Sequence, residues 1–162
     1  MGNTATSASV SVTVANTGPV AASNFDEGSG SVLNDRTGKG HNGTMAGAGW
    51  SAAGNTCGAL SFGGARVGST DRNVNGTGAV PANAWTHLAV IYDATTIRLY
   101  VNGVQVSSVA SAGNLAGSGN PLRIGGNLIW GEYFCGPVDD VRVYNRALSA
   151  AEVTADRSTP VS

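Results

Sequence analysis

The chain has 162 residues, a length that suits one domain with a single hydrophobic core. It carries 9 Lys and Arg against 10 Asp and Glu, a net charge of −1, and no basic run, which argues against a nucleic acid partner. No apolar segment approaches the roughly 20 residues of a membrane-spanning helix, so we expect no membrane partner, and the 24 glycines are typical of a secreted bacterial β-protein with many tight turns.

The first part of the chain predicts short strands separated by turns. Residues 4–15 alternate small or polar side chains with Val and predict the last strand of a preceding domain. Residues 20–25 predict a first strand of the main domain, and residues 26–49 predict glycine-rich turns. A short strand is expected at 59–62, whereas residues 63–84 are polar and contain little that would pack.

Residues 85–109 give the clearest fold signal. Two β-rich runs flank the polar link at residues 93–96, and a third run follows directly after Asn102 and Gly103. Asn-Gly between apolar runs is a strong hairpin signal, because both central residues of a type I′ turn need positive φ. The pattern therefore predicts a three-stranded antiparallel meander.

The rest of the chain predicts two strands and one helix. Residues 122–124 predict the start of one strand, and residues 138–144 predict another with alternate side chains on one face. Ser149 and Glu152 have the spacing of a capping box, so we expect a short helix to start at Ala150.

Several motifs follow one another along the chain: Phe25–Gly30, Asp35–Thr44, Gly58–Phe62, the meander, Arg123–Gly126 and Val138–Ser149. As a set they resemble the bacterial laminin-G-like, concanavalin A-like jelly-roll domains, and the resemblance covers about residues 20–155. It implies an all-β jelly-roll sandwich of two antiparallel sheets, with the N- and C-terminal strands adjacent and one short C-terminal helix.

The resemblance also implies a division of the chain. Residues 1–18 are expected to be the tail of an immunoglobulin-like module with a linker, residues 19–157 the jelly-roll domain, and residues 158–162 a C-terminal tail. The parent protein is expected to be secreted or at the cell surface of a bacterium. Typical members have further strands where this chain has residues 63–84, so the domain is expected to be shortened in the middle. Unpaired sheet edges could then mediate homo-oligomer formation.

The resemblance implies a non-catalytic domain that binds carbohydrate. Sugar rings stack on exposed aromatic side chains, and their hydroxyls pair with acidic, amide and guanidinium groups. The aromatic cluster at residues 129–134 predicts a platform for a polysaccharide or oligosaccharide, formed by Trp130, Tyr133, Glu132, Arg123 and Asn127. The alternative is that Trp130 and Phe134 cap the core. Trp50 and Trp85 are expected in the core.

A structural calcium ion is also implied by the resemblance. Calcium takes six to eight oxygen ligands, and the loop at residues 35–44 offers carboxylate, amide and carbonyl oxygens. In such domains this loop meets an acid of the last strand, which gives the expected metal site Asp26, Asp35, Asn42 and Asp140. Asp35 is expected to hold the loop by hydrogen bonds. The alternative is a set of turn-forming side chains beside a solvated acidic pair.

The two cysteines are expected to form a disulfide bond. Cys57 precedes the strand at 59–62 and Cys135 precedes the strand at 138–144, and the resemblance places these two strands side by side. A metal site or a nucleophilic cysteine is an alternative with fewer supporting residues, because the chain has no further Cys and only two His.

Catalysis is the main alternative function. Glycosidases of the same architecture carry two acids two to four residues apart on one strand, a pattern that this chain lacks. Its adjacent pairs, Asp26-Glu27 and Asp139-Asp140, would diverge on an extended chain. A small glycoside hydrolase would have to use Glu132 with Asp139 or Asp140. A further alternative is a structural or adhesion module that binds other proteins.

Overall fold

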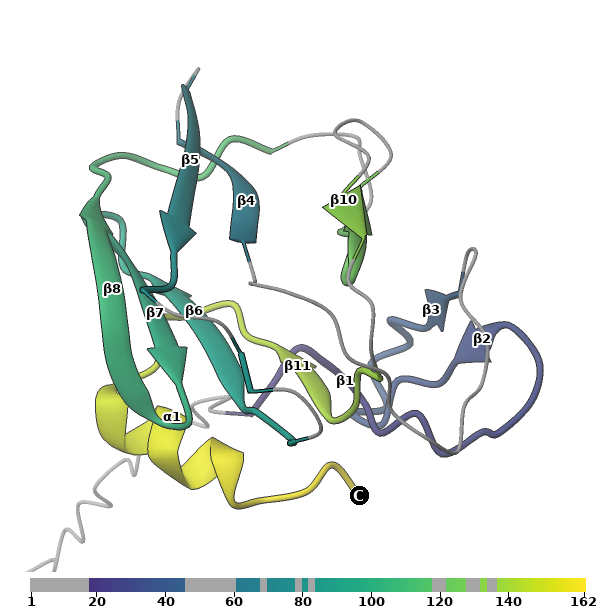
Figure 1. Ribbon diagram of the computed structural model, residues 1–162. Helices are drawn as coiled ribbons and strands as arrows, with labels where there is room; N and C mark the ends of the chain where they lie inside the picture. Colours follow the sequence, from purple (N-terminus) through teal and green to yellow (C-terminus); the bar gives the residue numbers. More distant parts are fainter. Residues whose placement is uncertain are drawn as a thin grey trace, which may run out of the picture.

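A computed structural model of the chain describes residues 18–45, 61–67, 70–77, 80–81, 84–117, 122–127, 132–133 and 137–162. These residues form short strands and one helix, arranged as Figure 1 shows. The elements are β1 (Ala21–Ser23), β2 (Val32–Leu33), β3 (Gly43–Thr44), β4 (Ser61–Val67), β5 (Thr70–Asn75), β6 (Leu88–Tyr92), β7 (Thr96–Val101), β8 (Val104–Ala110), β9 (Gly126–Asn127), β10 (Glu132–Tyr133), β11 (Val141–Val143) and α1 (Ala150–Arg157). The strand pairs of the described residues are all antiparallel, so the predicted all-β class with a C-terminal helix is confirmed.

The predicted meander forms the central sheet, in the order β6–β7–β8. Its turn at Asn102 and Gly103 has φ values of 51° and 81°, the positive values that a type I′ turn needs. Leu99 of β7 is 1% exposed, because the middle strand is covered on both faces. The sheet therefore organises the elements around it.

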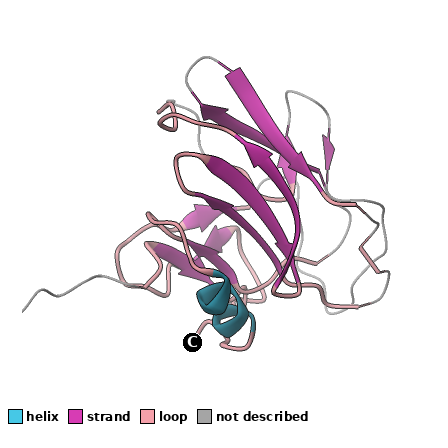
Figure 2. Ribbon diagram, turned by 90° about the vertical axis from the view of Figure 1, so that its left-hand side faces the viewer, coloured by secondary structure: helices cyan, strands magenta, loops and turns pink. Residues whose placement is uncertain are grey.

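Each face of the central sheet packs against a different element. On one face, Ile97 and Leu99 form a buried cluster with Val74 of β5. On the other, Ile91 and Tyr100 pack against Leu148 and Val153 of the helical end of the chain. Alternation along β6 and β7 separates the two sets of side chains. Figures 1 and 2 show the β4–β5 hairpin and α1 on opposite sides of the sheet.

The first and last strands are adjacent, as predicted. Ala21 of β1 is the register partner of Val143 of β11, and Ser23 is the partner of Val141. Tyr144 follows β11, packs against the helical core cluster and donates its hydroxyl proton to Asp156 of α1 at 2.8 Å. Burial, with this bond as the second cause, raises the pKa of Tyr144 to about 12.

The capping box at the start of α1 is also confirmed. The Ser149 hydroxyl accepts the Glu152 N–H at 3.3 Å, and the Glu152 carboxylate accepts the Ser149 N–H at 2.8 Å. The Arg146 guanidinium, 2.7 Å from that carboxylate, is the largest of the causes that lower the pKa of Glu152 to about 2. Val153, 1% exposed, then anchors the helix on the sheet.

The prediction that residues 63–84 contain little that packs was wrong. This segment continues β4, which the sequence had ended at residue 62, and adds all of β5; the two strands pair as a hairpin. Polar neighbours hide the signal, because Arg72, Asn73 and Asn75 are exposed while Val74 between them is 1% exposed. Val74 therefore packs the hairpin against the central sheet although its neighbours on β5 are polar.

Two further strand predictions were also wrong in their bounds. Residues 122–124 are exposed and form no strand, and the strand β9 begins after Gly125, whose φ of 78° turns the chain. The last strand covers only Val141–Val143, because Asp140 has a φ of 50° that no extended strand adopts.

Within the described residues, the two strands that the resemblance placed side by side do not pair with each other. β4 is hydrogen-bonded to β5, and β11 to β1. Cys57 and Cys135 lie outside the described residues, so their disulfide stays a prediction.

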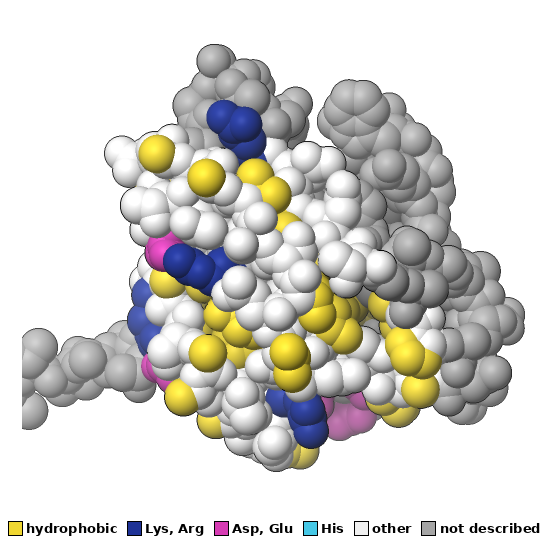
Figure 3. Space-filling model, turned by 60° about the vertical axis from the view of Figure 1, so that its left-hand side comes forward, with side chains coloured by type: hydrophobic (Ala, Val, Ile, Leu, Met, Phe, Trp, Pro, Cys, Tyr) yellow, Lys and Arg dark blue, Asp and Glu magenta, His cyan; other side chains and the backbone are white. Residues whose placement is uncertain are grey.

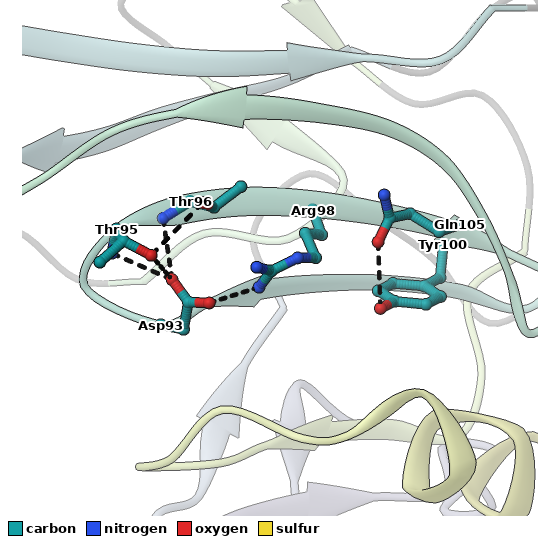
Figure 4. Close-up of polar contacts among 6 residues, drawn as sticks. All are labelled: Asp93, Thr95, Thr96, Arg98, Tyr100 and Gln105. Carbon is teal, nitrogen blue, oxygen red and sulfur yellow. Dashed lines mark hydrogen bonds and ion pairs between the residues drawn. The ribbon is translucent and has the colours of Figure 1, made fainter.

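The turn between β6 and β7 is built around one carboxylate (Figure 4). Asp93 Oδ1 accepts the N–H groups of Thr95 and Thr96 at 3.0 and 2.8 Å and the Thr95 hydroxyl at 2.6 Å. Its Oδ2 lies 2.5 Å from Arg98 Nη1. The Thr95 hydroxyl, followed by Arg98, lowers the pKa of Asp93 well below its usual range.

Charged side chains are sparse on the surface. On the face shown in Figure 3, the Lys and Arg side chains of the described residues stand apart from one another, and some of them lie beside Asp or Glu side chains. Within the described part of the chain, no helix is long and apolar enough to cross a membrane.

Candidate functional site

The loop between β2 and β3 is held by the carboxylate of Asp35. Its Oδ1 accepts the N–H groups of Ala22 at 3.1 Å and Thr37 at 3.0 Å, and its Oδ2 accepts the N–H of His41 at 3.0 Å. The Thr37 hydroxyl adds bonds of 2.8 and 2.9 Å to the two oxygens. Desolvation raises the pKa of Asp35, but these bonds outweigh it and hold that pKa well below its usual range. Asp35 thus ties β1 to the loop.

The other expected metal ligands each accept a hydrogen bond from a different partner. Asn42 Oδ1 accepts the Asp35 N–H at 2.9 Å, Asp26 Oδ2 accepts the Asn24 amide at 2.8 Å, and Asp140 Oδ1 accepts the Val161 N–H at 2.9 Å. Burial, with the negative charges of Asp140 and Asp26 as lesser causes, raises the pKa of Asp139. Negative charge therefore gathers where the chain enters β11.

The adjacent acids are not on extended chain, contrary to the prediction. Asp139 and Asp140 precede β11, and the Asp140 N–H is bonded to Asp139 Oδ1 at 2.8 Å. Asp26 and Glu27 lie in a turn that follows Phe25, whose φ is 51°. The geometric reason given against a paired catalytic role therefore does not apply to either pair.

The predicted carbohydrate platform is described only in part. β9 and β10 form a hairpin in which Glu132 is the register partner of Asn127, and Tyr133 of Gly126. Arg123 is exposed on the chain that leads into this hairpin. Trp130, like Trp50 and Phe134, lies outside the described residues, so the platform stays a prediction.

A second candidate site, which the sequence did not predict, lies at one end of the central sheet. Trp85, Asn102, His87 and Arg157 line a surface hollow of about 470 Å³. Trp85 is 70% exposed, so the expectation that it lies in the core was wrong. The pairing of Leu88 with Val101 could have indicated this arrangement, because it places residues 85–87 opposite the Asn-Gly turn.

The hollow, which we call the Trp85 hollow, has a hydrogen-bonded frame. The His87 N–H is bonded to Asn102 Oδ1 at 3.0 Å, and the Asn102 N–H to the His87 carbonyl at 2.8 Å. Arg157 Nη1 donates to the Asn102 carbonyl at 2.6 Å. The turn thus rests on α1, as Figure 1 shows for the link between β7 and β8. Helix and turn hold the lining side chains in place.

The groups around the hollow differ in charge and in whether their charge is paired. Burial lowers the pKa of His87; Asp156 acts in the opposite direction, and Arg142 and Arg157 lower it further. The imidazole is therefore neutral at neutral pH. Asp156 is already engaged, because Arg142 Nε lies 3.4 Å from its Oδ1. In the described part of the chain, Arg157 forms no ion pair.

Comparison with known proteins gives the family. The family described as the Concanavalin A-like lectin/glucanases superfamily matches residues 6–154. The chain belongs to this superfamily. The family indicated by the sequence motifs is thus confirmed for this concanavalin A-like domain. The match begins ahead of the predicted domain start at residue 19, and the domain boundaries stay a prediction.

Other comparisons add little to this result. No curated protein matches the concanavalin A-like domain. A similar solved structure is the 2.1 Å crystal structure of residues 221–444 of an S-layer domain-containing protein from Clostridium thermocellum ATCC 27405. The two are 17% identical with a TM-score of 0.38, and the match covers 96% of this chain and 71% of that one.

The donor set at the loop of residues 35–44 fits a metal only in part. Both oxygens of Asp35 are filled by hydrogen bonds, so this side chain organises the loop and does not suit a ligand role. Within the described residues, no group of three or more His, Cys, Asp and Glu lies close enough to hold a metal ion. Asp26, Asn42 and Asp140 each accept one side-chain hydrogen bond from the described residues and keep further lone pairs.

Proposed function

We propose that this concanavalin A-like domain is a non-catalytic carbohydrate-binding module of a secreted or cell-surface bacterial protein. The observation that carries the proposal is membership, over residues 6–154, of a superfamily described by its lectins and glucanases. Lectins bind sugars and glucanases cleave them, so the proposal requires a reason to prefer binding.

Most of the described carboxylates with a shifted pKa favour binding over cleavage, and Asp139 is the exception. Hydrolysis of a glycosidic bond needs a carboxylic acid that keeps its proton near neutral pH and a second carboxylate about 5–9.5 Å away. Hydrogen bonds hold the pKa values of Asp35, Asp93 and Glu152 low, so these groups are poor proton donors. Asp139 has a raised pKa, and Glu132 with Asp139 or Asp140 is the hydrolase alternative.

For the binding surface we propose the platform on the β9–β10 hairpin. Trp130 and Tyr133 would stack on sugar rings, while Glu132, Asn127 and Arg123 would pair with hydroxyl groups. The register of Glu132 opposite Asn127 and the exposure of Arg123 support this assignment.

We also propose a structural calcium ion between Asp26, Asn42 and Asp140. Burial is the largest cause of the raised pKa of Asp139, and the charges of Asp140 and Asp26 are lesser causes; a cation beside these acids would neutralise that repulsion. Calcium would supply a positive charge that joins the Asp35 loop to the chain entering β11. Asp35 would act through the loop conformation that it fixes.

Isothermal titration against a polysaccharide panel, with and without a chelator, tests the function. We expect at least one glycan to bind, and Tyr133→Ala to weaken it about tenfold or more while Arg72→Ala, an exposed side chain on β5, does not. Absence of binding to every glycan would overturn the proposal. Release of reducing ends that disappears in Glu132→Gln would favour the hydrolase instead.

The calcium proposal has its own test. Added calcium should raise the Tm of the wild-type domain and of Asp93→Asn, whose carboxylate serves a different turn. Asp26→Asn should remove most of that increment. An unchanged Tm of the wild type on addition of millimolar calcium would contradict the metal site without touching carbohydrate binding.

A further inference from the structure

The Trp85 hollow is an open depression lined by one aromatic and three polar side chains. Its volume of about 470 Å³ falls within the roughly 300–1,000 Å³ of typical ligand pockets. The indole of Trp85 is 70% exposed, an unusual position for the largest apolar side chain. An exposed aromatic face at the wall of a hollow offers a flat surface on which a sugar ring can stack.

The guanidinium of Arg157 presents one complete edge to a ligand. Its Nη1 is bonded to the Asn102 carbonyl at 2.6 Å, which leaves Nε and Nη2 with no bond to other described residues. This is the edge that binds a carboxylate side-on through two parallel hydrogen bonds. Since Arg157 also forms no ion pair in the described part of the chain, its charge is available to an anion.

The remaining lining groups add donors but no negative charge. Asn102 uses its Oδ1 to accept the His87 N–H, and its amide Nδ2 makes no bond to other described residues. His87 is held neutral by burial. The nearest acid in electrostatic terms, Asp156, is bonded to Tyr144 and Arg142. The hollow is therefore donor-rich and positive, which excludes a cationic ligand and favours an anionic one.

We propose that the Trp85 hollow binds a uronic acid residue of an acidic polysaccharide. The sugar face lies on the Trp85 indole, the carboxylate pairs with the Nε–Nη2 edge of Arg157, and a ring hydroxyl accepts a bond from Asn102 Nδ2. The inference rests on the proposed carbohydrate-binding function and names the substrate class, at a site separate from the β9–β10 platform.

A matched pair of ligands tests the charge requirement. Trigalacturonate and its methyl ester share the same rings, but only the acid carries carboxylates. Isothermal titration of the whole chain should give a Kd for the acid at least tenfold lower than for the ester. The affinity for the acid should fall as salt rises, because the ion pair is at the surface. In proton–nitrogen NMR spectra, the indole N–H signal that is missing in Trp85→Phe should shift with the acid.

Substitutions assign the binding to the hollow. Trp85→Ala and Arg157→Gln should each weaken trigalacturonate binding at least tenfold, and Arg157→Lys should give an intermediate loss, because lysine keeps the charge but not the fork. Arg72→Gln removes the same charge from β5 and should leave the affinity unchanged. Thermal melts of each variant show whether the domain is still folded, and the indole signal reports on the hollow independently of heat release.

The outcomes separate this inference from the proposed function. If glycans bind but Trp85→Ala and Arg157→Gln bind them as tightly as the wild type, the hollow is not the site and the module function stands. Equal affinity for the acid and the ester overturns the carboxylate contact, as does binding of a sulfated oligosaccharide without binding of the uronate. If the wild type binds no glycan, the module function fails first.

Discussion

The two ends of the central sheet use their polar groups in opposite ways. At the β6–β7 turn, both carboxylate oxygens of Asp93 are bonded to Thr95, Thr96 and Arg98 (Figure 4). At the β7–β8 turn, Asn102 and Arg157 use only part of their hydrogen-bonding capacity on one another. At the first end, both oxygens of the carboxylate already have hydrogen-bond partners. At the second end, Asn102 and Arg157 keep unused donors beside the exposed indole of Trp85.

This difference follows from local sequence. Asp followed two residues later by Thr closes its own turn, because a short carboxylate reaches the next backbone N–H groups. Asn-Gly makes a turn with its backbone alone, so the Asn side chain can serve elsewhere. Two hairpin turns of one sheet thus differ in function: one stabilises the fold and the other helps to build a hollow.

The largest expected effect comes from the sheet that connects the two ends. Leu99 is 1% exposed, and Leu99→Ala should lower the free energy of unfolding by about 3 kcal/mol through lost burial and a cavity. Urea denaturation measures the loss. Val104→Ala on β8, a side chain 66% exposed, is the control and should change stability by less than about 0.5 kcal/mol. Equal losses in the two variants would mean that this sheet is not the core.

A smaller effect is expected at the hollow end alone. Gly103 has a φ of 81°, and a Cβ there would come within 3.3 Å of the Thr154 hydroxyl. Gly103→Ala should therefore lower the free energy of unfolding by about 1–2 kcal/mol and weaken trigalacturonate binding. Gly117→Ala is the control, since a Cβ at that position meets nothing within 4 Å. Unchanged binding by a folded Gly103→Ala domain would separate the turn from the hollow.

The β6–β7 turn should affect the pH dependence of stability through Asp93. The pKa of Asp93 is lowered in the folded state, first by the Thr95 hydroxyl. Its contribution is therefore complete above the unfolded pKa of about 4, and it declines as the pH falls below that value. Asp93→Asn should be less stable than the wild type at pH 7, and the gap should narrow at pH 3. Urea midpoints of both proteins at the two pH values measure this stability difference. A difference that becomes larger in acid would contradict the ion pair.

The smallest stability effect is expected at Trp85. Because the side chain is 70% exposed, Trp85→Ala should change the free energy of unfolding by no more than about 0.5 kcal/mol, while it removes ligand binding. Paired urea and titration measurements would show this. A loss of unfolding free energy as large as that of Leu99→Ala would mean that Trp85 is a core residue and that the two ends of the sheet do not differ in this way.

Sequence patterns predicted those elements that are determined by residues close together in the sequence. The Asn-Gly turn and the Ser149 capping box depend on neighbouring residues, and both were found as predicted. The β1–β11 pairing followed from the family resemblance, which carries long-range information. Polar strands such as β5 were missed, because one buried Val74 among polar neighbours gives no periodic signal.

The site was harder to predict, because exposure depends on which layer covers a residue. Trp85 reads as a core residue by type, yet it lies before β6 starts and remains exposed. Leu122 and Ile124 are likewise apolar but 72% and 54% exposed, so apolar alternation alone did not make a strand there. The strand register, known only once β6 and β7 are paired, brings His87 opposite Asn102.

The pairing of β1 with β11 has a mechanical consequence. The chain enters β1 and leaves β11 at the same end of this two-stranded ladder, where the Val20 N–H is bonded to the Val143 carbonyl at 2.7 Å. Tension between the two flanking segments would first load α1, which is held by the apolar contacts of Val153 and Leu148 and by hydrogen bonds of Asp156 with Tyr144 and of Arg157 with the Asn102 carbonyl. It would then open the ladder one hydrogen bond at a time, like a zipper, and leave the central sheet intact. Under load the domain would lengthen stepwise at low force instead of breaking at once.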